Sequence, residues 1–295
     1  SAATPITTSI WNASSRVGAM MKARGEEAGL VGEAGSRSRR AISALDLRAR
    51  VPVRTHSPLA LTTPTIGAVI RYTTDGSEPL ETGGTATTYT GPISLTATGD
   101  WKLARCIRAQ AFAPAMLASG TNTQTYFIDM DAQISGVPNL VLSGEAEKTF
   151  YKPYGVLAID GGTYGVTAAN DIWIPNTPAS YNLAIGHGQP FEREAHLEWY
   201  FPTGYYPNAA QQPYRGDLGI RYSASPYSRP RAKMAFSSTA SPFPTGNATE
   251  KPSFNFYFRS DFGDGTLNYN IFPGYTANEF EHLRLRAGKK DRKST

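Results

Sequence analysis

Three side chains that could bind a metal ion alternate along one predicted strand, residues 194–201. Glu194, His196 and Glu198 stand two residues apart, and alternate residues of a strand project from the same face of a sheet. Carboxylate and imidazole groups are common metal ligands. Such groups also line many water-facing sheets, and the remaining histidines show no ligand spacing. We therefore expect these residues to form no metal site.

A second group of chemically useful residues lies in the basic loop 223–231. Arg229 and Arg231 could each bind a phosphate through two hydrogen bonds, because the guanidinium group is a planar fork of donors. The loop has no glycine, and Pro226 and Pro230 remove two backbone N–H donors that a phosphate cradle would use. The residues alone leave two interpretations open: a phosphate site, or a basic loop that is solvated or paired within the fold.

The tripeptide Asp261-Phe262-Gly263 spells the metal-binding signature of ordinary protein kinases. It lies between two predicted strands, however, and no His-Arg-Asp sequence precedes it. The dipeptide Asp264-Gly265 that follows is typical of a hairpin turn. We predict a turn here and no metal site.

The elements that must position these residues are short strands. Between residues 58 and 128, hydrophobic residues recur with period two and are interrupted by turn residues such as Asp75-Gly76. Six or seven short strands at this spacing predict a small β-sandwich.

Residues 129–288 are richer in aromatic residues and show almost no helical periodicity. Strands are predicted at 139–142, 155–159, 194–201, 218–222, 253–259 and 282–286. The predicted fold class of the whole chain is therefore mainly β.

The charge of the protein is concentrated outside these two regions. The chain of 295 residues has a formal net charge of +5. Residues 1–57 hold nine basic and four acidic side chains, and the tail 289–295 holds four basic and one acidic, so that residues 58–288 carry about −3. The segment 1–57 is predicted to be poorly ordered: it is either a genuine basic linker or text from a shifted reading frame. The positive net charge of the chain is therefore no argument for a nucleic-acid partner.

Two further classes are excluded by composition. Cys106 is the one cysteine, so that the chain has no internal disulfide and no cysteine-based zinc site. No apolar run approaches the roughly 18 residues of a membrane span, and no secretion signal is visible. We expect no membrane-spanning segment.

The first strand-rich region resembles the immunoglobulin-like domain found at the C-terminus of chitobiase and β-hexosaminidase enzymes. The resemblance rests on four runs, namely 70–79 (Ile-Arg-Tyr-Thr-Thr-Asp-Gly-Ser-Glu-Pro), 89–93, 107–112 and 125–126. It implies an accessory sandwich without catalytic residues, which acts as a spacer or docking element on an extracellular protein.

The second region resembles the N-terminal part of the CotH family, spore-coat-type proteins that are atypical protein kinases. The resemblance rests on residues 191–200, 219–221, 251–269 and 280–288, and the third of these runs is the most specific. It implies that the complete protein uses ATP and Mg²⁺. It also implies a nucleotide-binding role for Lys251, Arg221, Arg229 and Arg231.

In CotH-like kinases the metal-binding and catalytic carboxylates follow the Leu-Arg-Ala-Gly strand, which here is residues 285–288. The chain ends at Thr295. We therefore expect a fragment of a secreted kinase-like protein that is inactive alone, with no catalytic residue assigned.

The alternative hypothesis is a structural or adhesion protein at the cell surface without catalysis. Aromatic loops at 205–207 and 213–214 could stack on sugars. The partner is then an extracellular surface or polysaccharide, whereas the kinase hypothesis implies a protein substrate. Both hypotheses predict an extracellular or cell-surface location.

Overall fold

The computed structural model describes residues 58–95, 104–128, 136–165, 172–202, 205, 213–226, 228–232, 252–272 and 274–286, and the backbone of residues 8–12 and 46–47. All strand pairs in this part of the chain are antiparallel. The prediction of a mainly β fold is confirmed. The chain forms two compact units: unit 1 comprises Ser1–Met20 and Asp131–Thr295, and unit 2 comprises Met21–Met130.

Unit 2 contains a four-stranded sheet with the order β6-β5-β8-β9. Its strands are β5 (Val69–Thr73), β6 (Thr87–Thr88), β8 (Ala104–Phe112) and β9 (Asn122–Phe127). Two short pairs complete the unit, β3 (Pro58–Leu59) with β7 (Ile93–Ser94) and β2 (Asp46–Leu47) with β4 (Leu61–Thr62). Except for the nine-residue β8, the strands are short because turn residues interrupt the chain every few residues.

The core of unit 2 lies between the four-stranded sheet and the short strands. Ile107 and Ala109 of β8 pack with Leu59 of β3 and Leu61 of β4, and all four are almost fully buried. Hydrophobic side chains from both layers interdigitate in this way in β-sandwiches. The arrangement agrees with the predicted sandwich.

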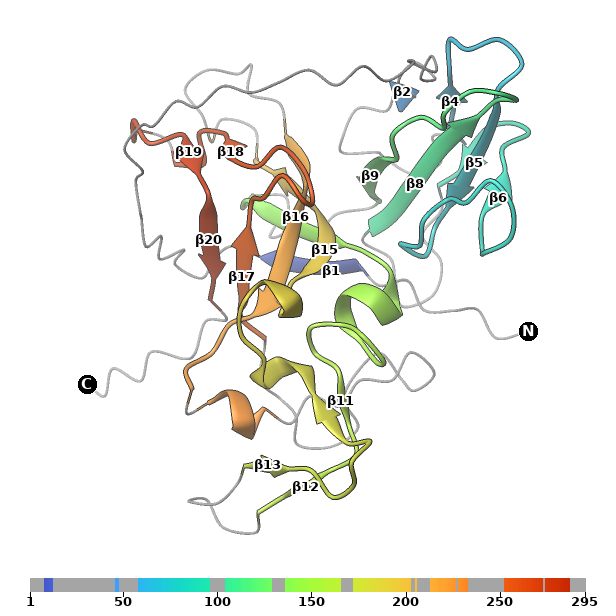
Figure 1. The fold of residues 1–295 in the computed structure, drawn as a ribbon. Helices are drawn as coiled ribbons and strands as arrows, with labels where there is room; N and C mark the ends of the chain where they lie inside the picture. Colours follow the sequence, from blue (N-terminus) through green and yellow to red (C-terminus); the bar gives the residue numbers. More distant parts are fainter. Residues whose placement is uncertain are drawn as a thin grey trace, which may run out of the picture. The chain divides into compact units, whose positions relative to one another are not determined.

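Unit 1 is built on a six-stranded sheet with the order β1-β10-β15-β16-β17-β20 (Figure 1). The strands are β1 (Thr8–Asn12), β10 (Asn139–Ser143), β15 (Arg193–Tyr200), β16 (Tyr214–Tyr222), β17 (Phe254–Tyr257) and β20 (His282–Leu285). β1 pairs with β10 over residues 8–12. Strands β1 and β2 therefore come from the segment 1–57; the rest of that segment and the tail 289–295 lie outside the described residues.

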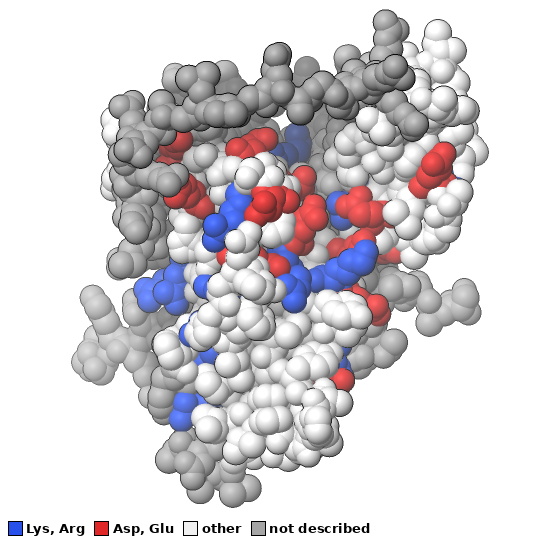
Figure 2. Space-filling view, viewed as in Figure 1, with Lys and Arg blue, Asp and Glu red and all other residues white. Residues whose placement is uncertain are grey.

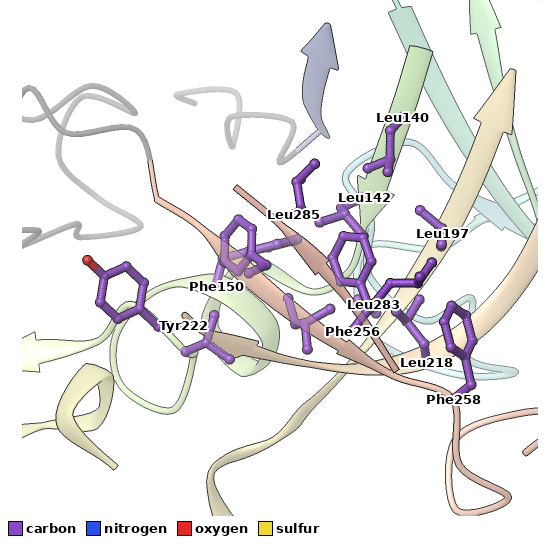
Figure 3. Packing of buried hydrophobic residues seen from close by; sticks show 14 of the residues in the cluster. Leu140, Leu142, Phe150, Leu197, Leu218, Tyr222, Phe256, Phe258, Leu283 and Leu285 are labelled. Atoms are coloured by element: carbon purple, nitrogen blue, oxygen red, sulfur yellow. The ribbon is translucent and has the colours of Figure 1, made fainter. Parts of the chain in front are cut away.

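The hydrophobic core of unit 1 covers one face of this sheet (Figure 3). Leu197, Leu218 and Phe256 project to this face from neighbouring strands, and each is at most 1% exposed. Leu140 and Leu283 extend the same layer toward the outer strands. Because side chains alternate along each strand, the opposite face receives the polar residues between them.

Short elements complete unit 1. The two-stranded pairs are β11 (Ile159–Asp160) with β14 (Tyr181–Asn182), β12 (Thr163–Tyr164) with β13 (Trp173–Ile174), and β18 (Leu267–Asn268) with β19 (Glu279–Phe280). The helical turns are the π-helical η1 (Ala146–Phe150) and the 3-10 turns η2 (Leu183–Ile185), η3 (Gln189–Phe191) and η4 (Arg229–Arg231).

The strand predicted at residues 155–159 is wrong over most of its length. Residues 155–158 form a tight turn against η1, in which the N–H groups of Val156 and Leu157 donate to the carbonyls of Thr149 and Phe150 at 3.0 Å. A Cβ atom at Gly155 would lie 2.1 Å from the carbonyl carbon of Phe150, so that the turn needs glycine. The apolar side chains of this run are buried in the core although they lie in a turn. A short apolar run in the sequence does not show whether the buried segment is a turn or a strand.

Candidate anion-binding site

Polar side chains of three neighbouring strands share the sheet face that lies opposite the core of unit 1. Arg221 of β16 is paired in register with Asn255 of β17, and Tyr257 of β17 is paired with His282 of β20. Residues paired in register project to the same face, as do residues two apart on one strand. Arg284, paired with Asn255, therefore belongs to the same face.

Arg221 is held against the aromatic ring of Tyr257. Its Nη2 donates to the Tyr257 hydroxyl at 2.6 Å, and its guanidinium carbon lies 5.3 Å from the ring centroid. The Tyr257 ring also stacks on the His282 ring, with centroids 4.9 Å apart and an interplanar angle of 22°. The Nε atom of Arg221 is buried and has no hydrogen-bond partner among the described residues. Arg221 thus keeps unused donor capacity.

Arg229 reaches the same region from η4. This turn forms because the Ser225 carbonyl accepts from the N–H groups of Ser228 and Arg229, both at 3.0 Å. Pro230 fits in the first positions of the turn, where a missing N–H costs nothing. Although Arg229 is only 7% exposed, its Nη2 lies 3.2 Å from Nε2 of His187.

The contact between Arg229 and His187 fixes the protonation of the imidazole. A guanidinium N–H can only donate, so that Nε2 of His187 must accept and the ring proton must sit on Nδ1. Burial, and then the positive charge of Arg221, lower the pKa of Arg229. An arginine stays charged under these conditions, and so two like charges are held near each other.

Arg259 also borders this site, and its charge is neutralised. Its Nε and Nη2 donate to the two carboxylate oxygens of Glu192 at 2.9 and 3.2 Å. Glu192 is buried, and its hydrogen bonds raise the pKa of Arg259. The guanidinium carbon of Arg259 lies 5.1 Å from the centroid of the Tyr257 ring.

His282 lies among several of these positive charges. Its pKa is lowered by burial first, and then by the charges of Arg221, Arg284 and Arg259. Glu192 opposes this effect. The free imidazole is therefore disfavoured as a cation, although the residue remains open to solvent.

We call Arg221, Arg229, Arg259 and Arg284, with His187 and His282, the arginine cluster. Two carboxylates border it: Glu192, and Asp261, which accepts from Nε2 of Gln189 at 2.6 Å. In the described part of the chain, the cluster thus contains four guanidinium groups and is bordered by these two carboxylates, which leaves a positive excess. Figure 2 shows basic and acidic side chains next to one another on the visible face of unit 1. His187 and His282 are exposed, so that an anion from solvent can approach.

The structure brings together two of the four residues predicted to bind a nucleotide. Arg221 and Arg229 lie close enough for their charges to interact. Arg231 belongs to the same turn, where its N–H donates to the Ser228 carbonyl at 3.1 Å. Lys251 lies outside the described residues. The nucleotide-binding role of all four stays a prediction.

Sequence reasoning missed His187, Tyr257 and His282 as members of the site. The histidines carried no ligand spacing, because one precedes η3 and the other lies on β20, almost a hundred residues later. Tyr257 and His282 become neighbours only through the register of β17 and β20. Alternation along residues 253–259 and 282–286 was the one signal that could have placed them on a common face.

The tripeptide at 261–263 forms the predicted turn. The N–H groups of Phe262 and Gly263 both donate to the Arg259 carbonyl at 3.0 Å. The turn packs on β16: a Cβ atom at Gly219 would lie 2.5 Å from the Phe262 ring, and one at Gly263 would lie 2.5 Å from the Asp217 carbonyl. These two glycines allow the turn to approach the strand closely.

The alternating residues of β15 are engaged by neighbouring side chains. Nδ1 of His196 lies 2.7 Å from a carboxylate oxygen of Asp217, the residue opposite it on β16. The Tyr200 hydroxyl donates to Glu198 at 2.5 Å, and Nε of Arg215 donates to the same oxygen at 3.3 Å. Among the described residues, no group of three or more His, Cys, Asp or Glu side chains could hold a metal ion.

Two of the aromatic residues proposed to stack on sugars pack within unit 1. Tyr205 stacks on Phe201 with centroids 5.1 Å apart. Tyr214 packs against the core cluster and meets the edge of Phe258, and burial raises its pKa to about 12. Residues 206 and 207 lie outside the described residues.

Comparison with known proteins identifies one family in part of the chain. Residues 59–126, within unit 2, match a family described as Fn3 associated. No curated protein and no solved structure matches the chain. The match and the two packed layers of strands agree with an immunoglobulin-like β-sandwich in unit 2. Within the part of the chain that the structure describes, no helix is long and apolar enough to cross a membrane.

Proposed function

We propose that unit 1 binds the phosphate groups of a nucleotide such as ATP at the arginine cluster, in the manner expected of the β-rich lobe of a CotH-like protein kinase. The observation that carries this proposal is that two arginines lack an acidic partner in the described part of the chain. Neither Arg221 nor Arg229 has a carboxylate partner among the described residues; they contact a phenol, a carbonyl and an imidazole instead. Their positive charges interact, and both adjoin residues 187–188, so that an anion bound there would be attracted by both.

The site suits phosphate better than a single carboxylate. A phosphate offers several strong acceptor oxygens, and each guanidinium can donate two roughly parallel hydrogen bonds. Burial restricts the side chain of Arg229, so that little side-chain entropy is lost on binding. The sequence resemblance adds Lys251 and Arg231 as further predicted phosphate contacts.

The proposal does not extend to Mg²⁺ in the described residues. These residues offer no set of three or more metal ligands, whereas Mg²⁺ at nucleotide sites is held by carboxylates together with phosphate oxygens. Unit 1 is therefore proposed to bind and orient the phosphates, with phosphoryl transfer to a protein substrate as the activity of the family it resembles. Unit 2 is proposed as an extracellular spacer or docking module.

Isothermal titration calorimetry with ATP tests the proposal. We expect the full chain to bind ATP and inorganic triphosphate but not adenosine, because the cluster contacts phosphate. Arg221→Ala and Arg229→Ala should each weaken binding about tenfold or more, the effect of losing hydrogen bonds to a charged group. Lys148→Ala is the matched control: it removes an exposed positive charge from η1 and should leave the affinity unchanged.

Two results would overturn the proposal: no detectable binding of ATP or triphosphate to the wild-type chain, or full affinity in both arginine variants. Circular dichroism spectra of the variants must match the wild type. Arg229→Lys gives a second reading, because lysine keeps the charge without the planar fork. It should bind with an affinity between those of the wild type and Arg229→Ala.

A second candidate function is adhesion to an extracellular polysaccharide without nucleotide binding. The observation that favours it is the Fn3-associated match in unit 2, which has the packed core of a β-sandwich. Retention of the chain on chitin, together with no heat of ATP binding, is the result expected from this function. Failure of the chain to bind chitin, together with binding of ATP, would exclude this second function in favour of the first proposal.

A further inference from the structure

We infer that anion binding at the arginine cluster is coupled to proton uptake by His187 and His282, so that the site binds anions more tightly as the pH falls. This inference rests on the proposed function and adds regulation to it. It concerns the two residues of the cluster that can change charge near neutral pH.

The first step of the argument is the geometry around His282. Its ring stacks on Tyr257, whose hydroxyl accepts from Arg221. The charged groups that interact with His282 are Arg221 from β16, Arg259 after β17, Arg284 from β20, and Glu192 after η3. Three of these four are positive, and Glu192 is already bound to Arg259.

The second step is the geometry around His187. Its Nε2 accepts from Arg229, and this is possible only while that nitrogen carries no proton. The backbone carbonyl of the next residue, Gly188, lies 3.5 Å from Nη1 of Arg221. Both arginines thus adjoin the His187 loop.

An anion changes this balance. With a negative charge bound at the cluster, the positive charges of Arg221, Arg284 and Arg259 no longer depress the pKa of His282 as far, whereas the effect of burial remains. Each histidine can then take a proton from solvent and donate an N–H to the anion. Nδ1 of His187 already carries a proton. When Arg229 donates its N–H to the anion in place of the imidazole, Nε2 of His187 can take up a second proton.

Linkage gives the sign of the effect. If the anion raises the affinity of the cluster for protons, protons raise its affinity for the anion by the same factor. A pKa change of one unit at a single histidine corresponds to about a tenfold change in affinity. Binding should therefore tighten about tenfold or more between about pH 8 and about pH 5.5, the range in which histidine titrates.

Sulfate is the probe of choice, because it keeps its charge throughout this range and the pH dependence then belongs to the protein. We would titrate sulfate into the full chain at about pH 8 and about pH 5.5 and follow amide chemical shifts. ATP would be titrated in parallel at the higher pH. The double variant His187→Gln with His282→Phe should bind sulfate equally at both pH values. Its glutamine can still accept from Arg229, and its phenylalanine can still stack on Tyr257.

His196→Gln is the matched control, because His196 lies on β15 of the same sheet and is paired with Asp217. It should keep the full pH dependence. Equal sulfate affinity of the wild type at both pH values, with ATP still bound, would overturn the inference and leave the proposed function standing. A double variant that keeps the wild-type pH dependence would likewise overturn the inference and leave the proposed function standing. Absence of sulfate binding at both pH values, together with absence of ATP binding at the higher pH, would overturn the proposed function itself.

Discussion

At the scale of single residues, four arginines of unit 1 have partners of two different kinds. Arg215 and Arg259 contact the buried carboxylates of Glu198 and Glu192. In such pairs the arginine compensates the charge of a carboxylate that the fold has buried away from water. Arg221 and Arg229 contact neutral groups instead. The first kind explains stability, and the second kind is what an anion site requires.

The pair of Arg259 and Glu192 gives a prediction for stability. Arg259→Ala leaves the Glu192 carboxylate buried and unpaired, which should lower the free energy of unfolding by about 3 kcal/mol. The double variant with Glu192→Gln should lose less, because no charge is then stranded. Urea denaturation of the single and double variants measures both. A change within about 0.5 kcal/mol for Arg259→Ala would show that the pair contributes nothing.

At the scale of elements, the sheet and its turns determine which residues meet. The period-two patterns at 194–201, 218–222 and 282–286 predicted β15, the second half of β16 and β20 within a few residues. The pairing of β17 with β20 then brings Tyr257 to His282. The contact of Arg229 with His187 depends on two loops whose course no periodicity encodes. The arginines were therefore predictable from the sequence, but their neutral partners were not.

β1 shows a second limit of sequence reasoning. Residues 8–12 form a strand that pairs with β10, more than a hundred residues away in the chain. The rest of the segment 1–57 is rich in Ala, Gly, Ser and Arg, although residues 6–11 (Ile-Thr-Thr-Ser-Ile-Trp) contain strand-favouring residues. Strand formation there depends on a partner strand, and local patterns contain no information about which strand that is.

Turn chemistry was more predictable, since the tripeptide at 261–263 forms the expected turn.

The packing of that turn on β16 can be tested at the same scale. Gly219→Ala would place a Cβ atom 2.5 Å from the Phe262 ring, and this overpacking should lower the free energy of unfolding by about 1–3 kcal/mol. Phe262→Ala removes the obstacle, so the double variant should be less destabilised than the sum of the two single variants. Thermal unfolding of all three variants gives the coupling. Strict additivity would contradict the described contact.

At the scale of the whole molecule, the two units have separate cores and different evidence for function. Unit 2 carries the family match, and unit 1 carries the arginine cluster. The net charge of +5 comes from the segments 1–57 and 289–295, whereas residues 58–288 are mildly acidic. Local placement of charge in unit 1, rather than the overall balance, is therefore the basis for expecting an anionic ligand.

A separate core in unit 2 predicts independent folding. Residues 21–130 expressed alone should unfold in one cooperative transition. Ile107→Ala should lower the free energy of unfolding by about 2–5 kcal/mol, since Ile107 is 1% exposed in the core. Ile66→Ala is the control, because Ile66 is fully exposed. Denaturant titration would contradict this division of the chain if residues 21–130 showed no cooperative unfolding.

The central claim is that Arg221 and Arg229 together bind phosphate, and the most direct test observes their side chains. We would record the Nε–Hε nuclear magnetic resonance signals of the arginines while ATP is added to the full chain. The signals of Arg221 and Arg229 should shift progressively, while those of Arg71 and Arg108 in unit 2, which are bound to unit 2's own residues, should stay in place. Unchanged Arg221 and Arg229 signals at saturating ATP, or shifts confined to other arginines, would contradict the claim.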